Sequence, residues 1–432
     1  MSERGPASTL RDVRVPACLL GMPFASDREG LARVNLTVMD GRVAHIDAAT
    51  LGEAGGFGGR IVMPCFVDAH VHLDKGQIWP RAPNPDGSFM GALTTVGSDR
   101  EVHWSAPDLR ARMEFGLRCA YAHGTRALRT HLDSVGPQTR ITWPVFAELS
   151  EAWAERVELH ASPLFGIEHA LDDTHMCDIT GMLVACGGAM PTLGAVTYMA
   201  PVLQEGLDRL FRLASDKFWD LDFHVDETND PAAHSLRIIA ETALRFKFPH
   251  RILAGHCCSL AVQPQGEAAR TIDLVAQAGM SVVSLPMCNL YLQDRGRALT
   301  PRWRGVTALH ELKAAGVDTM IASDNTRDPF YAYGDLDMLE TWREGTRILH
   351  LDHPFGDWAA SVTSAPAAAL GLADAGCIAV GAPANFMLFR ARSMTELFAR
   401  PQSDRAVFRD GLQIDAALPD YSELDHLRGL SP

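Results

Sequence analysis

The sequence predicts a (β/α)8 TIM-like barrel that carries a small β-sandwich domain built from both chain termini. Three observations lead to this fold class. The chain has 432 residues, which is more than a single compact core usually holds. Between residues 62 and 372, eight short β-rich runs alternate with stretches that have helical periodicity. Histidines and acidic residues gather at the ends of these runs, where a barrel of this kind places its reactive groups.

The eight runs are nearly continuous in apolar residues, as expected for parallel strands whose sheet is buried on both faces. The first is residues 61–75, which read IVMPCFVDAHVHLDK. The others are residues 125–133, 156–164, 181–188, 220–227, 250–257, 281–286 and 318–325. Between them, stretches such as 107–123 and 309–316 alternate apolar and charged residues in the pattern of helices packed on one face.

The two ends of the chain carry matching strand signals. Residues 9–59 alternate short apolar runs with turns, and Asp40-Gly41 is a strong cue for a hairpin. Near the other end, Asp410-Gly411 repeats that cue. Neither piece is long enough for a stable sheet of its own. We therefore expect residues 1–61 and 373–432 to form one β-sandwich domain, and residues 62–372 to form the barrel.

Composition excludes several classes of function. An apolar content of 47% and a net charge of −14 describe a globular protein without the basic surface that nucleic acids require. Nine cysteines without a Cys-x-x-Cys pair indicate a reducing compartment. The start of the chain lacks the pattern of a signal peptide, and no apolar run is long enough to span a bilayer. We expect a cytoplasmic protein with a small-molecule partner, either monomeric or a homo-oligomer.

His70 and His72 are the strongest chemical signal in the chain. In an extended strand, residues two apart point to the same face, so both imidazoles converge at the end of the first run. Two converging neutral imidazoles suit a divalent metal ion. A single histidine pair is more often structural, so the interpretation depends on further ligands at the same edge.

Later runs supply these ligands. His224 ends the fifth run and Asp324 ends the eighth, so together with the histidine pair they offer three nitrogens and one oxygen. Such a set leaves room for a water molecule, as in hydrolytic metal sites. Taken singly, each residue is better explained as a buried, hydrogen-bonded polar residue than as a ligand, and only the set of four indicates a metal site. The sequence predicts one divalent ion, Zn²⁺ or Fe²⁺, without deciding between them.

Three residues have the chemistry of catalytic groups. Glu227 follows His224 by three positions and is suited to move a proton to a ring nitrogen or a leaving amine. His256 ends the sixth run and is suited to polarise the attacked centre, unless it only orients a ligand. Asp324 would accept the proton of the attacking water as well as bind the metal. His131 is interpreted as a structural or supporting residue rather than a ligand.

These motifs, taken together, resemble the amidohydrolase superfamily, and within it the cytosine deaminase branch. The segments that carry the resemblance are PCFVDAHVHLDK, RTHLD, HVDE, AGH, NLYLQDR and SDNTRDPF, in that order along nearly the whole chain. The resemblance implies hydrolysis of an amino-bearing carbon in a nitrogen heterocycle, with release of ammonia. It implies a metal bound by His70, His72, His224 and Asp324, a proton shuttle at Glu227 and an electrostatic partner at His256.

Two departures from that branch bear on the substrate. Cytosine deaminases place a glutamine after the proline of the third strand, whereas this chain has Leu164, which cannot form hydrogen bonds with a pyrimidine. Asn325 stands where they have a second aspartate, and Phe330 stands at the aromatic stacking position. Leu164 and Phe330 are equally compatible with simple packing in a pocket wall. The departures argue against cytosine and favour a related amino- or alkylamino-substituted ring.

Alternatives to a deaminase remain at this point. One is a hydrolase of N-alkylamino-substituted triazines or cyclic amides on the same metal site. A binuclear hydrolase is disfavoured because the fourth run lacks a lysine for a bridging carbamate, and a non-enzymatic metal protein is disfavoured by the presence of Glu227. The loop at residues 76–95 is expected to cover the barrel mouth. The roles of Lys75, Arg100, Arg327 and Asp328 are left open.

Overall fold

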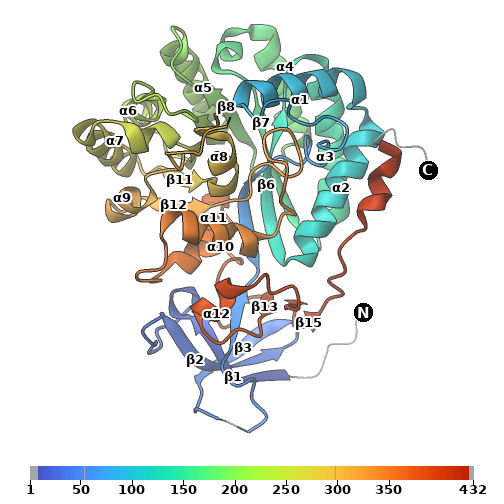
Figure 1. Ribbon diagram of the computed structural model, residues 1–432, viewed down its shortest axis with the longest axis vertical. Coiled ribbons are helices and arrows are strands. Elements are labelled where there is room, and N and C mark those ends of the chain that lie inside the picture. The colour runs from blue at the N-terminus through green and yellow to red at the C-terminus, as the bar shows by residue number, and fades with distance from the viewer. Residues whose placement is uncertain (1–7, 53, 297, 428–432) are drawn as a thin grey trace. The chain divides into compact units, whose positions relative to one another are not determined.

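A computed structural model of the chain describes residues 8–52, 54–296 and 298–427 (Figure 1). It divides into two compact units. The terminal unit comprises Met1–Asp68, Cys119–Ala127 and Asp337–Leu418. The central unit comprises Ala69–Arg118, Leu128–Leu336 and Pro419–Pro432. Among the described residues, no helix combines the length and the apolar character that crossing a membrane would need.

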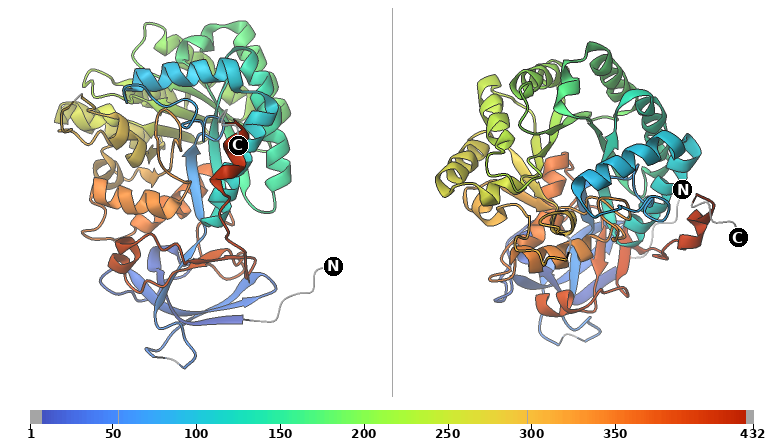
Figure 2. Two further views of the ribbon diagram at one scale, coloured as in Figure 1. Left: turned by 45° about the vertical axis from the view of Figure 1, so that its right-hand side comes forward. Right: turned by 45° about the horizontal axis from the view of Figure 1, so that its top comes forward.

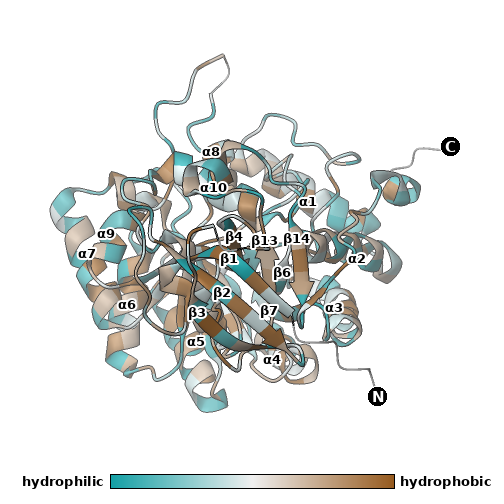
Figure 3. Ribbon diagram, turned by 90° about the horizontal axis from the view of Figure 1, so that it is seen from below, coloured by the Kyte–Doolittle hydropathy of each residue, from teal (hydrophilic) through white to brown (hydrophobic). Residues whose placement is uncertain are grey.

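The terminal unit contains a seven-stranded sheet to which both ends of the chain contribute. Its strands, in spatial order, are β15 (Leu412–Gln413), β14 (Ala406–Arg409), β13 (Phe386–Leu388), β4 (Arg60–Pro64), β1 (Ser8–Pro16), β2 (Leu31–Met39) and β3 (Arg42–Ala48). Apolar side chains on β1 and β2, including Val13 and Val34, pack with Phe386 in the core of this unit. Figure 3, which colours the ribbon by hydropathy, shows brown, hydrophobic stretches along β2. This sheet joins the two termini as expected, and the β-sandwich stays a prediction.

Both Asp-Gly cues mark hairpins, as predicted. Asp40 and Gly41 connect β2 to β3 with backbone φ angles of 52° and 77°, and the two strands pair antiparallel. Asp410 and Gly411 connect β14 to β15 with φ angles of 47° and 75°. Positive φ at both turn residues matches the twist of the flanking strands, and Gly and Asp adopt it at low cost.

The run at residues 61–75, which we predicted as one strand, forms two. β4 ends at Pro64 and belongs to the sheet of the terminal unit. β5 (Phe66–Val71) begins after Cys65 and belongs to a different sheet, of order β5-β6-β7, in which it pairs with β6. Both strands are almost wholly buried, so the apolar pattern alone gave no sign of the break.

Eight successive strands, running mostly through the central unit, form two further sheets. One has the order β5-β6-β7 and the other the order β12-β11-β10-β9-β8. Neighbouring strands of the second sheet pair in parallel. The strands that follow β5 are β6 (Thr125–Asp133), β7 (Glu158–Leu164), β8 (Thr192–Thr197), β9 (Asp220–Val225), β10 (Ile252–His256), β11 (Ser281–Ser284) and β12 (Asp318–Ile321).

Helices separate most of these strands along the chain, and in the right-hand view of Figure 2 the green and yellow ones lie around the outside of the strands. α5 shows why: Leu203, Leu207 and Leu210 recur at helical spacing and are buried. The helices are α1 (Phe89–His103), α2 (Ala106–Ala122), α3 (Thr139–Trp153), α4 (Asp173–Cys186), α5 (Leu203–Lys217), α6 (Ser235–Phe246), α7 (Gln265–Gln277), α8 (Pro286–Leu292), α9 (Leu309–Ala314), α10 (Met338–Leu349), α11 (Ser364–Leu370) and α12 (Met394–Ala399).

The predicted fourth strand, residues 181–188, is wrong. Residues 181–186 are the last turns of α4, and the fourth strand is β8. The helix begins where the Asp172 side chain accepts hydrogen bonds from the backbone N–H groups of Thr174 and His175, an N-cap that the sequence analysis overlooked. A short apolar run fits a strand or a helix equally well without such a cue. β8 also contains no lysine, so the argument against a carbamate-bridged binuclear centre is unchanged.

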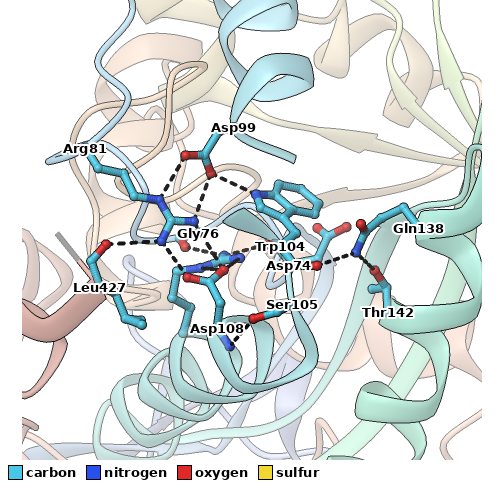
Figure 4. Close-up of polar contacts among 11 residues, drawn as sticks. Asp74, Gly76, Arg81, Asp99, Trp104, Ser105, Asp108, Gln138, Thr142 and Leu427 are labelled. Carbon is cyan, nitrogen blue, oxygen red and sulfur yellow. Dashed lines mark hydrogen bonds and ion pairs between the residues drawn. The ribbon is translucent and has the colours of Figure 1, made fainter. Parts of the chain in front are cut away.

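A network of buried charges holds the segment after β5 in place (Figure 4). Arg81 donates to both oxygens of Asp99, with distances of 2.9 Å, and also pairs with Asp108. Asp108 in turn accepts from Arg112 at 2.6 Å, and Arg112 donates to the carbonyl oxygens of Asp74 and Gly76. One carboxylate therefore neutralises two guanidinium groups, and one of these fixes the backbone on either side of Lys75.

Replacing Asp108 by alanine should lower the free energy of unfolding by about 3–5 kcal/mol, because the buried Arg112 loses the carboxylate that it pairs with and Arg81 keeps only Asp99. Chemical denaturation of the wild type and the variant would measure this. Glu114→Ala, an exposed change on the same helix, is the control and should stay within about 0.5 kcal/mol. A loss as small as that of the control would contradict the role assigned to Asp108.

Candidate metal and catalytic site

Three imidazoles and one carboxylate from separate strand ends meet in the interior of the central unit. His70 lies on β5, His72 just beyond it, His224 on β9, and Asp324 three residues past β12. The Asp324 Oδ1 atom is 3.2 Å from Nε2 of His72 and 3.6 Å from Nε2 of His70. The Nε2 atoms of His72 and His224 are 3.3 Å apart. The four residues predicted from the sequence are thus brought together.

The backbone that carries Asp324 is tied to the first strand. The Asp324 N–H donates to the carbonyl oxygen of His70 at 2.8 Å, and Val71 and Asp324 form a parallel bridge. Asp324 and His256 both have left-handed backbone, with φ angles of 65° and 66°. Residues other than glycine rarely adopt this conformation, and it is concentrated at functional sites, where the surrounding structure imposes it.

The cluster fits a divalent cation. Among the described residues, no hydrogen-bond partner is found for either ring nitrogen of His70, for Nδ1 of His224, or for either carboxylate oxygen of Asp324, although all are buried. Burial lowers the pKa of His70 and His224 well below the usual value and that of His72 to about 4, so the rings are neutral at pH 7. Neutral imidazoles and a carboxylate without partners are the donors that a metal ion would satisfy.

His131 lies in the same group of rings. Single ring nitrogens of His70, His72, His131 and His224 all lie within 4.8 Å of one another. The Nε2 atom of His131 is 3.1 Å from Oδ1 of Asp222. The other oxygen of Asp222, Oδ2, accepts a hydrogen bond from Arg129 at 2.9 Å. A carboxylate that holds one nitrogen of an imidazole is the arrangement of a residue that supports a metal site. The interpretation of His131 as a supporting residue stays a prediction.

Glu227 and His256 lie beside the cluster, and a third residue connects them. Nδ2 of Asn289 on α8 donates to Oε1 of Glu227 and lies within hydrogen-bond distance of Nδ1 of His256, both at 3.0 Å. Burial, followed by the charge of Asp324, raises the pKa of Glu227 well above its usual value. A carboxyl group with a raised pKa can hold a proton near neutral pH, which suits a proton shuttle.

The cluster opens into a pocket of about 700 Å³. Leu164, Asn325 and Phe330, the three residues predicted to contact substrate, all line it, as do Glu227 and His256. Asn325 and Phe330 are held by Asp328, whose carboxylate accepts from Asn325 Nδ2 at 2.7 Å and from the Phe330 N–H at 2.8 Å. Asp328 thus shapes the wall of the pocket.

Lys75 and Arg100 also line the pocket and share one partner. The Lys75 ammonium is 2.8 Å from Oδ1 of Asp133, and Arg100 donates to Oδ2 at 2.7 Å. The ammonium also lies 5.5 Å from the centre of the Phe330 ring. Arg327 donates to Gln77 at 3.1 Å and lies over the Tyr421 ring.

The sequence analysis gave no role to Asn289, Asp222 or Asp133. Asn289 lies in the NLYLQDR segment that contributed to the family resemblance, and Asp133 is the last residue of the RTHLD segment and of β6. The position of Asp133 at a strand end was the available signal for that residue, whereas Asp222 lies within β9 and Asn289 on a helix. A polar residue at a strand end can face the pocket, a neighbour or solvent, however, and only the structure decides which.

The fold and the site have relatives among known proteins. Residues 150–412 match the model of the amidohydrolase family, and the chain belongs to that family. A pterin deaminase from Rhizobium rhizogenes is 53% identical over 97% of this chain and 96% of its own length. An N-isopropylammelide isopropyl amidohydrolase from a Pseudomonas species is 24% identical over 78% of this chain and 81% of its own length.

A solved structure shows the same fold. The 5-methylcytosine deaminase from Klebsiella pneumoniae, liganded with phosphonocytosine, superposes with a TM-score of 0.81 at 24% identity, over 94% of this chain and 98% of the other. Family membership and the histidine-rich cluster support a divalent metal. The prediction of a hydrolytic deaminase acting on a small heterocycle, with water as the second reactant, is confirmed.

Gly255 on β10 leaves space for one of the imidazoles. A Cβ atom at this position would lie 3.1 Å from Nδ1 and Cε1 of His70, which is tighter than ordinary contact. We expect Gly255→Ala to displace that ring and weaken zinc binding about tenfold, the effect typical of a disturbed support of a ligand. Competition with a chelator would measure it. Gly181→Ala, which meets nothing within 4 Å, should bind zinc as the wild type does; equal binding by both variants would contradict the prediction.

Proposed function

We propose that the protein is a pterin deaminase, which hydrolyses the exocyclic amine of a pterin or a closely related bicyclic heterocycle and releases ammonia. The observation that carries the proposal is the 53% identity to a pterin deaminase over 97% of the chain. The pocket supports it, because Leu164 and Phe330 offer apolar surface for a planar ring, and Leu164 cannot form the hydrogen bonds expected for cytosine.

We further propose that His70, His72, His224 and Asp324 hold one Zn²⁺ or Fe²⁺ ion, both of which accept imidazole and carboxylate ligands. Such an ion would supply a water molecule made nucleophilic at neutral pH. The support is the burial of all four side chains together with the donor atoms that have no other partner among the described residues.

The residues around this ion are proposed to move protons and to stabilise charge during the reaction. In the reaction a bond forms between the water oxygen and the amino-bearing carbon, and the carbon–nitrogen bond breaks with transfer of protons to the amine. Glu227 is proposed to carry protons to the ring nitrogen and the leaving amine, for which its buried carboxyl group is suited. His256 is proposed to stabilise negative charge on the attacked centre, with Phe330 stacking on the ring.

We also propose that β5 to β12 close into the predicted (β/α)8 barrel. Two parallel bridges support closure, since Val71 with Asp324 connects the β5 end to the β12 end, and Gly166 with Val196 connects the β7 end to β8. All site residues then lie at the C-terminal ends of strands, as in other barrels of this kind. We expect the enzyme to work in the reducing cytoplasm, consistent with its nine free cysteines, and a homo-oligomeric state stays a prediction.

The substrate proposal is tested by assaying zinc- and iron-loaded protein on pterin, cytosine, aminopurines and N-alkylaminotriazines. We expect ammonia release to be fastest with pterin, and Glu227→Gln to reduce kcat by about 100-fold or more, because the proton carrier is lost. Ammonia and alkylamine are quantified separately. Turnover of triazines with release of alkylamine, or undiminished turnover by Glu227→Gln, would contradict the proposal.

The ligand assignment makes a separate prediction. His224→Ala should weaken zinc binding on the order of 100-fold, because one of the four proposed donors is removed. Metal analysis after dialysis against a chelator measures this without any assay of activity. His103→Ala changes an exposed histidine of α1 and should retain the metal of the wild type. Equal zinc contents in the two variants would exclude His224 as a ligand.

A further inference from the structure

Asn289 lies between the two proposed catalytic residues and contacts both through the same atom. It is fully buried on α8. Its amide nitrogen is 3.0 Å from Oε1 of Glu227, on the loop after β9, and 3.0 Å from Nδ1 of His256, at the end of β10. A primary amide carries two N–H bonds, so each contact receives one hydrogen.

With the amide nitrogen directed at both residues, the contact with His256 indicates where the hydrogen of that ring lies. An amide nitrogen only donates, so the Nδ1 atom that faces it presents a lone pair. A ring whose Nδ1 accepts must carry its hydrogen on Nε2. The competing arrangement has Nδ1–H donating directly to Glu227, but that separation is 3.4 Å, longer than both contacts of the amide.

The choice of tautomer matters because His256 is within reach of the metal cluster. One of its ring nitrogens, a nitrogen of His70 and an oxygen of Asp324 all lie within 4.8 Å of one another. His256 Nε2 is buried and has no hydrogen-bond partner among the described residues. The position of His256 is therefore compatible with two roles, binding the ion or donating a hydrogen bond to the substrate.

We propose that Asn289 is a positioning residue that makes this choice. It fixes His256 in the tautomer with hydrogen on Nε2, which keeps this imidazole out of the ligand set and aims a donor at the attacked centre. By occupying Oε1 of Glu227, the same amide leaves Oε2 as the atom that carries the shuttled proton. The inference rests on the proposed deaminase reaction for its catalytic consequence, but the tautomer itself can be observed without substrate.

The direct test is nitrogen NMR of zinc-loaded protein labelled with ¹⁵N-histidine, because the chemical shifts of the two ring nitrogens report which one carries hydrogen. His256→Gln identifies the signals of this residue. We expect hydrogen on Nε2 in the wild type. In Asn289→Asp, a variant of nearly the same shape, the carboxylate accepts from the ring and hydrogen should move to Nδ1. Hydrogen on Nδ1 in the wild type, or an unchanged tautomer in Asn289→Asp, would overturn the inference.

Kinetics separate positioning from a merely structural role. We expect Asn289→Asp and Asn289→Leu to lower kcat by about 100-fold while KM changes only a few-fold, because the lost donor acts mainly in the transition state. Leu290→Ala, an exposed change on the same helix, should match the wild type in both parameters. Thermal unfolding of each variant checks that it is folded. Unchanged kcat in a folded Asn289→Asp would also overturn the inference.

The two proposals fail in different ways. If the protein turns over none of the heterocycles, the proposed function is wrong, whereas the NMR result still decides the tautomer. If pterin is deaminated but the wild-type tautomer has hydrogen on Nδ1, the function stands and the inference about Asn289 is wrong.

Discussion

The structure depends on a cluster of buried donors that the protein itself leaves unsatisfied. Asp324 lies 3.6 Å from His70 and 3.2 Å from His72, His224 lies 3.3 Å from His72, and burial keeps the three rings neutral. Burying such polar groups without partners is costly, and a divalent cation held among them would offset that cost. The need to hold such a cation would explain why the strand ends converge here, why residue 255, beside the His70 ring, is a glycine without a Cβ atom, and why the Asp222 carboxylate lies beside His131.

Around this cluster the pocket divides into two kinds of surface. Glu227, His256 and Asn289 form a polar side, in which the Asn289 amide contacts both of the other side chains. Leu164 and Phe330 form an apolar side. Lys75 and Arg100 lie at the pocket as well, but Asp133 pairs with both, which limits the net charge that a substrate meets.

The sequence predicted the features that depend on local periodicity or turn chemistry. The spacing of two between His70 and His72 placed both on one face, and both Asp-Gly pairs marked hairpins. It did not predict the break at Cys65, because the strands on both sides of it are buried and read as one apolar run. It did not predict the helical end of α4, because buried strands and helices share the same apolar composition over a short run. Asn289 was missed for a different reason. Its role comes from a contact with residues 33 and 62 positions away, which periodicity does not encode.

The left-handed backbone at His256 and Asp324 has a consequence for engineering. Side chains with a Cβ atom carry a conformational penalty there of about 1 kcal/mol or more, which glycine escapes. A selection for thermal stability alone would therefore favour glycine at both positions, at the cost of the roles proposed for these two side chains. Stability and the proposed activity place opposite demands on these two residues, so stabilising substitutions should be sought elsewhere in the chain.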